Sequence, residues 1–118
     1  MSFKINAAYI GDGQVELTHG LSGNKMVTDL PPDNGGKGRT FSPTDLAAAS
    51  VASCVLTIMA KMAERDGLDL RGASFEIEKH MQEGPRRIAK LTGTITVPAG
   101  LTLKKREKVL AALAGGSV

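Results

Sequence analysis

The sequence is poor in several residue types, and each shortage excludes a class of protein. Its 118 residues contain one cysteine, so an intramolecular disulfide is excluded, and we expect the chain in the reducing cytoplasm. There is no tryptophan, one tyrosine and three phenylalanines. A single-strand nucleic-acid binder would stack bases on aromatic rings and gather its basic residues in a stripe. The fifteen basic residues are scattered among twelve acidic ones, so no nucleic-acid partner is expected.

Targeting signals and cofactor motifs are also missing. A membrane span needs about 20 apolar residues, and we expect no segment of that length and no membrane partner. The N-terminus has no basic start followed by a long apolar run, which argues against a secretory signal. His19 and His80 have no metal ligands at suitable spacing. Residues 35–38 lack the spacing of a phosphate-binding loop, so no metal and no cofactor is expected.

The length and hydrophobic content fit a single domain spanning residues 1–118. Near the N-terminus, three short segments have strand composition and are separated by Gly and Asn turns, which predicts an antiparallel meander. These segments are residues 4–10, 14–19 and 24–30. Residues 31–43 contain several prolines and glycines and are predicted to be a loop without regular structure.

The segment between Ser42 and Gly67 has the signals of one long helix. Ser42 is a good N-cap, Pro43 suits the first helical position, and Asp45 can complete the cap. Gly67 marks the expected stop. Residues 46–60 carry no charge, so the helix is expected to be central and buried on most sides. Its small residues would let another helix approach closely, and a second copy of this helix is one candidate neighbour.

Two elements are predicted after the helix. Residues 73–81 and 87–98 alternate as strands and predict a long β-hairpin with Gly84 and Pro85 at its turn. Residues 102–113 place apolar side chains on one side and predict a second helix.

Cys54 lies near the middle of the long helix and has two interpretations. Ser50 and Thr57 are one turn away and Lys61 is two turns away, so polar groups could assist a reactive thiol. Against this, mid-helix positions lower a thiol pKa less than helix N-termini do. Free cysteines also usually behave as small buried hydrophobes. Spacing alone therefore favours an inert Cys54.

The charged residues that could serve Cys54 also have plainer interpretations. Asp45 is nine residues away on the opposite helix face, so capping is favoured over a role as a base. Arg39 in the loop, and Arg86 and Arg87 beside the hairpin turn, are candidates for positioning an anion or a peroxide. Adjacent strand residues face opposite ways, so at most one of the last two points at a given site.

The order of these segments resembles that of the OsmC/Ohr family, the osmotically inducible protein C and organic hydroperoxide resistance proteins. The most specific stretches are SPTDLAAASVASCVLTIM in the helix and EKHMQEGPRRI in the hairpin. The resemblance implies an α+β protomer that intertwines with a second one, with both long helices inside the homodimer. It also implies reduction of organic hydroperoxides by a thiolate at Cys54, whose sulfenic acid a second cysteine resolves before an external dithiol reduces the disulfide.

The chain departs from the family pattern at three places. The second cysteine would fall near Gly116, where the sequence reads AGGSV, and the usual C-terminal strand segment is expected to be missing. The acidic residue that active members place ten residues before the first cysteine is Thr44 here. Their activating arginine has no match, because residues 1–38 contain no arginine.

Two classes of function therefore remain open. In the first, Cys54 is the peroxidatic residue of a stress-response hydroperoxide reductase, resolved by an external thiol or by Cys54 of another chain. In the second, the chain is an inactive paralogue or binds a small apolar or thiol-reactive ligand in the dimer interface without turnover. The candidates for lining the pocket or activating the thiol are Arg39, Thr44, Asp45, Ser50, Thr57, Arg86 and Arg87.

Overall fold

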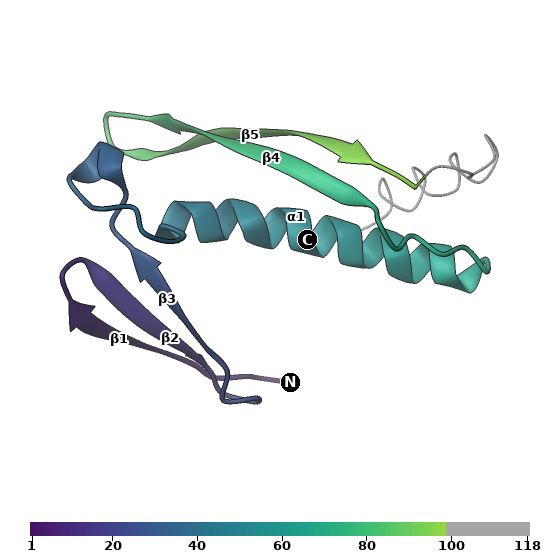
Figure 1. The fold of residues 1–118 in the computed structure, drawn as a ribbon, viewed down its shortest axis with the longest axis horizontal. Coiled ribbons are helices and arrows are strands. Elements are labelled where there is room, and N and C mark those ends of the chain that lie inside the picture. The colour runs from purple at the N-terminus through teal and green to yellow at the C-terminus, as the bar shows by residue number, and fades with distance from the viewer. Residues whose placement is uncertain (99–118) are drawn as a thin grey trace. The chain divides into compact units, whose positions relative to one another are not determined.

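The computed structural model describes residues 1–98, so the helix predicted at residues 102–113 lies outside the described residues. The chain forms two compact units, Met1–Leu46 and Ala47–Val118. The first contains an antiparallel meander of β1 (Ile5–Gly11), β2 (Gln14–His19) and β3 (Lys25–Asp29), in that order (Figure 1). The meander predicted from the turn residues is confirmed.

One face of the meander is apolar and exposed. Strand alternation places Ile5, Ala7 and Tyr9 on one face of β1. The register adds Leu17 beside Ala7, and Met26 beside Leu17. Ile5 and Tyr9 are each 70% exposed. A small sheet gains most of its stability from burying such a face, and in the described chain this face stays exposed.

The connection from β3 to the long helix is more regular than predicted. It contains a short 3-10 helix, η1 (Pro32–Asn34), and Gly35 ends this turn with a φ of 84°. Glycine adopts this left-handed conformation readily because it has no Cβ. The prolines and glycines that predicted an irregular loop therefore build a defined turn.

Helix α1 (Pro43–Arg65) begins and ends where the sequence predicts. The Ser42 N–H donates to Asp45 Oδ2 at 2.9 Å, and the Asp45 N–H donates to Ser42 Oγ at 3.1 Å, which is a complete capping box. At the other end, Gly67 has a φ of 71°. The Leu68 N–H donates to Ala63 O at 3.0 Å in a Schellman motif.

The second unit contains the predicted hairpin, formed by β4 (Ser74–Gln82) and β5 (Arg87–Thr96). Phe75 packs so closely over Gly93 that a Cβ at Gly93 would overlap the ring. The core of this unit joins one stripe of α1 to the segment that follows it. Its buried members are Met59, Ala63, Leu68 and Leu70, with Val55, Ala73, Ile95 and Val97 packed against them.

The rest of α1 is less buried in the described chain than the charge-free stretch led us to expect. Of its residues, only Ala48, Met59 and Ala63 are buried. By length and composition alone α1 could cross a membrane, which corrects the expectation that no segment has this property. Such a helix is weak support for a span, because the core helix of a soluble protein has the same composition.

Candidate functional site

Cys54 is a half-buried cysteine on α1 that takes part in no disulfide. Helix geometry places it about 140° around the axis from Met59, the fully buried residue of the core stripe. Cys54 therefore lies on the side of the helix turned away from the core of the second unit.

The hydroxyls predicted near Cys54 lie on the same side of α1. Ser50 and Thr57 are exposed, one turn before and one turn after the cysteine. Ser50 Oγ donates to Ala47 O at 2.6 Å, so this hydroxyl is bonded to the backbone of its own helix. Lys61 continues the same side one turn further on and is also exposed.

Thr44 and Asp45 belong to the start of α1, in the first unit. Thr44 Oγ1 lies 3.2 Å from Ser42 Oγ. The Asp45 carboxylate accepts the Ser42 N–H, so the predicted capping role is confirmed. The acidic residue expected before the cysteine in the family is thus replaced by a hydroxyl that contacts the N-cap.

Arg39 holds the loop to the meander through a buried carboxylate, that of Asp29. The Asp29 side chain is fully buried, and its Oδ2 lies 2.8 Å from Arg39 Nε. It also accepts the N–H groups of Leu30 and Arg39, at 3.0 and 2.9 Å. The Arg39 hydrogen bonds lower the pKa of Asp29 to about 2, against the opposing effect of burial.

The same guanidinium reaches the turn between β1 and β2. Arg39 Nη1 donates to Asp12 Oδ2 at 3.0 Å, and Nη2 donates to both Asp12 O and Asp29 Oδ1. Lys37 Nζ also bonds Asp12 Oδ2, at 2.9 Å, and this bond is the main reason that the pKa of Asp12 is lowered. All three guanidinium nitrogens are thus engaged, and a role for Arg39 toward a peroxide stays a prediction.

Sequence reasoning missed this network, which we call the loop latch: Asp12, Asp29, Lys37 and Arg39. An aspartate between two glycines, and another at the end of a strand, were the available signals. Neither indicated a partner ten or more residues away along the chain.

Arg86 and Arg87 contact the hairpin turn. Arg87 Nη1 donates to Pro85 O at 2.8 Å, and Arg86 Nη1 lies 3.5 Å from Glu83 Oε1. Both side chains therefore contribute to the turn, and a role in positioning an anion stays a prediction for each.

The two histidines bond to hydroxyls. His19 Nδ1 lies 2.6 Å from Ser22 Oγ, and His80 Nε2 lies 2.8 Å from Thr92 Oγ1. Within residues 1–98, no group of three or more His, Cys, Asp or Glu side chains is placed to hold a metal ion.

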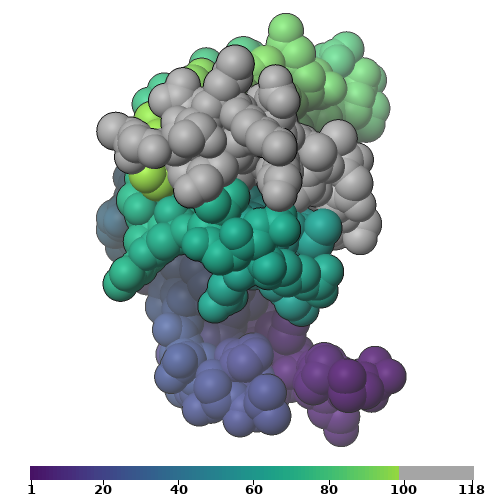
Figure 2. All heavy atoms as spheres, turned by 90° about the vertical axis from the view of Figure 1, so that its right-hand side faces the viewer, coloured from purple at the N-terminus to yellow at the C-terminus, as the bar shows by residue number. Residues whose placement is uncertain are grey.

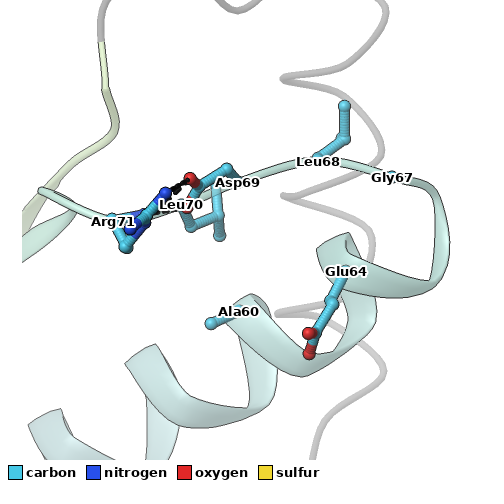
Figure 3. A pocket seen from close by; sticks show the side chains of 7 residues that line it. All are labelled: Ala60, Glu64, Gly67, Leu68, Asp69, Leu70 and Arg71. Carbon is cyan, nitrogen blue, oxygen red and sulfur yellow. Dashed lines mark hydrogen bonds and ion pairs between the residues drawn. The ribbon is translucent and has the colours of Figure 1, made fainter.

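Among the described residues of the second unit, two pockets are found, and Cys54 lines neither. The larger, of about 530 Å³, lies between the end of α1 and the segment after it (Figure 3). Its polar wall is the Asp69–Arg71 ion pair, at 2.7 Å, which lowers the pKa of Asp69. The smaller, of about 200 Å³, lies over the polar face of the hairpin beside Glu76 and Glu78.

Comparison with known proteins decides the family. Residues 36–116 match the family model for OsmC-like proteins. The chain belongs to the OsmC-like family. No match was found among curated protein sequences.

Solved structures agree with this assignment. A Psychrobacter arcticus protein, proposed to act in the osmotic stress and detoxification response, is 37% identical, with a TM-score of 0.86 over 96% of this chain and 82% of that one. An organic hydroperoxide resistance protein OsmC of Legionella pneumophila is 24% identical, with a TM-score of 0.66 over 98% and 83%. An OsmC-like protein of Mycoplasma pneumoniae is 12% identical, with a TM-score of 0.78 over 97% and 81%. The last two show the fold alone. The family and the α+β fold predicted from the resemblance are confirmed.

Proposed function

We propose that this OsmC-like protein reduces organic hydroperoxides in a stress response, with Cys54 as its single redox-active thiol. The observation that carries the proposal is the place of Cys54, a half-buried thiol in the middle of α1 that takes part in no disulfide. Proteins of this fold from Legionella pneumophila and Bacillus subtilis are described as organic hydroperoxide resistance proteins.

The proposed reaction uses two equivalents of an external thiol. The Cys54 thiolate attacks the peroxide, the O–O bond breaks, and the alkoxide takes a proton and leaves as an alcohol. Cys54 is then a sulfenic acid. A first thiol condenses with it, releasing water and forming a mixed disulfide. A second thiol attacks that disulfide, so that Cys54 returns as a thiol and the two external thiols leave as a disulfide.

We also propose that the working form is a cytoplasmic homodimer. The exposed apolar face of the meander supports this, as does the charge-free stretch of α1, most of which is not buried in the described chain. A single chain that exposed both surfaces would tend to associate. Sedimentation velocity, which measures mass in solution, tests this part of the proposal.

The test of the activity is turnover of cumene hydroperoxide with dithiothreitol in excess. Wild-type protein should turn over, and Cys54→Ser should lose all turnover because no other cysteine exists in the chain. Ser53→Ala is the matched control, since it removes the neighbouring exposed hydroxyl and keeps the thiol. Turnover that survives in Cys54→Ser would contradict the mechanism.

A second candidate function, binding without turnover, is favoured by the loop latch and the capping box. Both Arg39 and Asp45, the nearest charged residues before Cys54, are bonded to other groups. If wild-type protein shows no turnover, calorimetric titration with cumyl alcohol tests this alternative. A heat of binding that saturates as cumyl alcohol is added would support the binding function. If no heat is released or absorbed, this protein has neither the proposed turnover nor the proposed binding.

A further inference from the structure

The connection from β3 to α1 contains the one Asn-Gly pair of the sequence, Asn34 and Gly35. Asparagine is a thermolabile residue, because the backbone nitrogen of the next residue can attack its side-chain carbonyl carbon. Glycine hinders this attack least, since it has no Cβ. Asn6 and Asn24, the other asparagines, precede larger residues. The chemistry of the pair therefore marks Asn34 as the asparagine of this chain that is most prone to deamidation.

The structure exposes the pair but engages the nitrogen that would attack. Asn34 and Gly35 are exposed, and no heavy atom of the described chain lies within 4 Å of the position that a Cβ of Gly35 would take. Water therefore has access to the pair. The Gly35 N–H, however, donates to Pro32 O at 3.2 Å, at the end of η1. The nitrogen must give up this hydrogen bond before it can close a ring with Asn34 Cγ.

The residues after the pair fold back on the residues before it. The Gly36 N–H donates to Pro31 O at 2.9 Å, and the Gly38 N–H donates to Leu30 O at 3.1 Å. A Cβ at Gly36 would overlap Leu30 O, and a Cβ at Gly38 would overlap the Pro32 ring. The backbone of the closed loop is therefore packed too tightly to rotate into the geometry that the attack requires.

The loop latch joins the two ends of this loop. Asp29 precedes it and Arg39 follows it, and Arg39 donates to the buried Asp29 carboxylate through both Nε, at 2.8 Å, and its backbone N–H, at 2.9 Å. Lys37 and Arg39 are also bonded to Asp12, in the turn between β1 and β2. A protected backbone group reacts only as often as the structure around it opens locally. Opening of the latch is the event that would release this loop.

We propose that Asn34 is a deamidation site controlled by the loop latch, protected while the latch is closed and converted when it opens. In the reaction, the Gly35 nitrogen loses its proton and bonds to Asn34 Cγ. The C–N bond of the side-chain amide breaks, and ammonia leaves with that proton. Water then adds to either carbonyl of the succinimide ring, which opens to aspartate or isoaspartate at position 34.

The isoaspartate product makes the change one-way. Its main chain runs through the former side chain, so the backbone of the loop becomes one methylene longer. The contacts of Gly36 with Leu30 and of Gly38 with Pro32 leave no space for this methylene in the described chain. A loop that has formed isoaspartate can therefore no longer close as before, and the modification records that the latch has opened.

The test follows deamidation in the full chain, in neutral buffer, by peptide mass spectrometry. Conversion of an amide to a carboxyl group changes the peptide mass, and chromatography separates aspartate from isoaspartate. Asn24 is the internal control, because it is also exposed and lies in the turn between β2 and β3, which Figure 2 shows at the surface. Wild-type protein in concentrated urea gives the rate without the latch, and circular dichroism checks that each variant is folded.

We expect Asn34 of the folded wild type to convert at least about tenfold more slowly than in urea, and Arg39→Met to remove most of this protection. Asp12→Gly keeps the buried Asp29–Arg39 pair and should raise the rate about threefold, as for the loss of exposed ion pairs. Glycine tolerates the φ of 54° at this position. Arg71→Met, which removes an exposed ion pair away from the loop, is the matched control and should keep the wild-type rate.

Equal rates at Asn34 in folded and urea-treated wild-type protein would overturn the inference. So would conversion of Asn24 in urea as fast as that of Asn34, because the pair would then have no special chemistry. A wild-type rate in Asp12→Gly would also overturn it, and this variant decides if circular dichroism shows that Arg39→Met is unfolded. None of these outcomes depends on Cys54, so the inference and the proposed function fail separately.

Discussion

The loop latch and the Cys54 side of α1 use polar residues in opposite ways. In the latch, Asp29 is fully buried and accepts hydrogen bonds from two backbone N–H groups and one guanidinium. Around Cys54, Thr57 and Lys61 are exposed side chains on a helix with little charge. The difference indicates that the latch maintains the fold, whereas the polar groups on the Cys54 side of α1 remain exposed in the described chain.

Removing the guanidinium of the latch should have the largest effect on stability. Arg39→Met leaves the buried Asp29 carboxylate without its charged partner, which costs far more than losing an exposed ion pair. We expect the lowest Tm of the variants named here. Lys37→Met is the matched control, because it removes only the exposed bond to Asp12 and should barely change the Tm. Equal Tm values for the two variants would show that the latch does not hold the fold.

The latch should also make the free energy of unfolding depend on pH in the acidic range. Since the pKa of Asp29 falls to about 2 in the folded protein from an ordinary value of 3.8, folding favours its ionised form. This contribution is complete above about pH 5 and is lost as the pH falls toward 2. Urea unfolding across that range should show a decline in wild-type stability that is shallower in Asp29→Asn. Parallel curves would contradict this account of the carboxylate.

Losing the N-cap should have a smaller effect. Ser42→Ala removes the hydroxyl that accepts the Asp45 N–H, and typical caps of this kind contribute about 1 kcal/mol. Ser53→Ala, an exposed position on the same helix, should change the unfolding free energy by less than about 0.5 kcal/mol. Urea unfolding of both variants measures the difference, and an equal loss in the two would argue against the capping box.

Local signals predicted much of the fold. The capping box, the Schellman stop at Gly67 and the hairpin turn each depend on residues close in sequence, so their chemistry could be recognised without a structure. The order of the elements predicted from these signals indicated the family, and the most specific stretch of the resemblance surrounds Cys54. These are the features that short-range rules and a long motif can specify.

The parts that could not be predicted depend on contacts between residues that are distant along the chain. Asp29 and Arg39 are ten residues apart, and no spacing rule pairs them across a loop. The buried stripe of α1 at Met59 could not be distinguished from the other sides, because the whole charge-free stretch is apolar or small. The sequence also could not show that Arg39 is held in the latch. Because its guanidinium is engaged there, Arg39 is a weaker candidate for activating the thiol than the sequence suggested.

The most direct test of the central claim is the intact mass of the protein after one equivalent of cumene hydroperoxide, without any reductant. The account predicts a gain of one oxygen, about 16 Da, on wild-type protein as Cys54 becomes a sulfenic acid, and no gain on Cys54→Ser. An unmodified wild-type mass, or the same gain on both proteins, would contradict it.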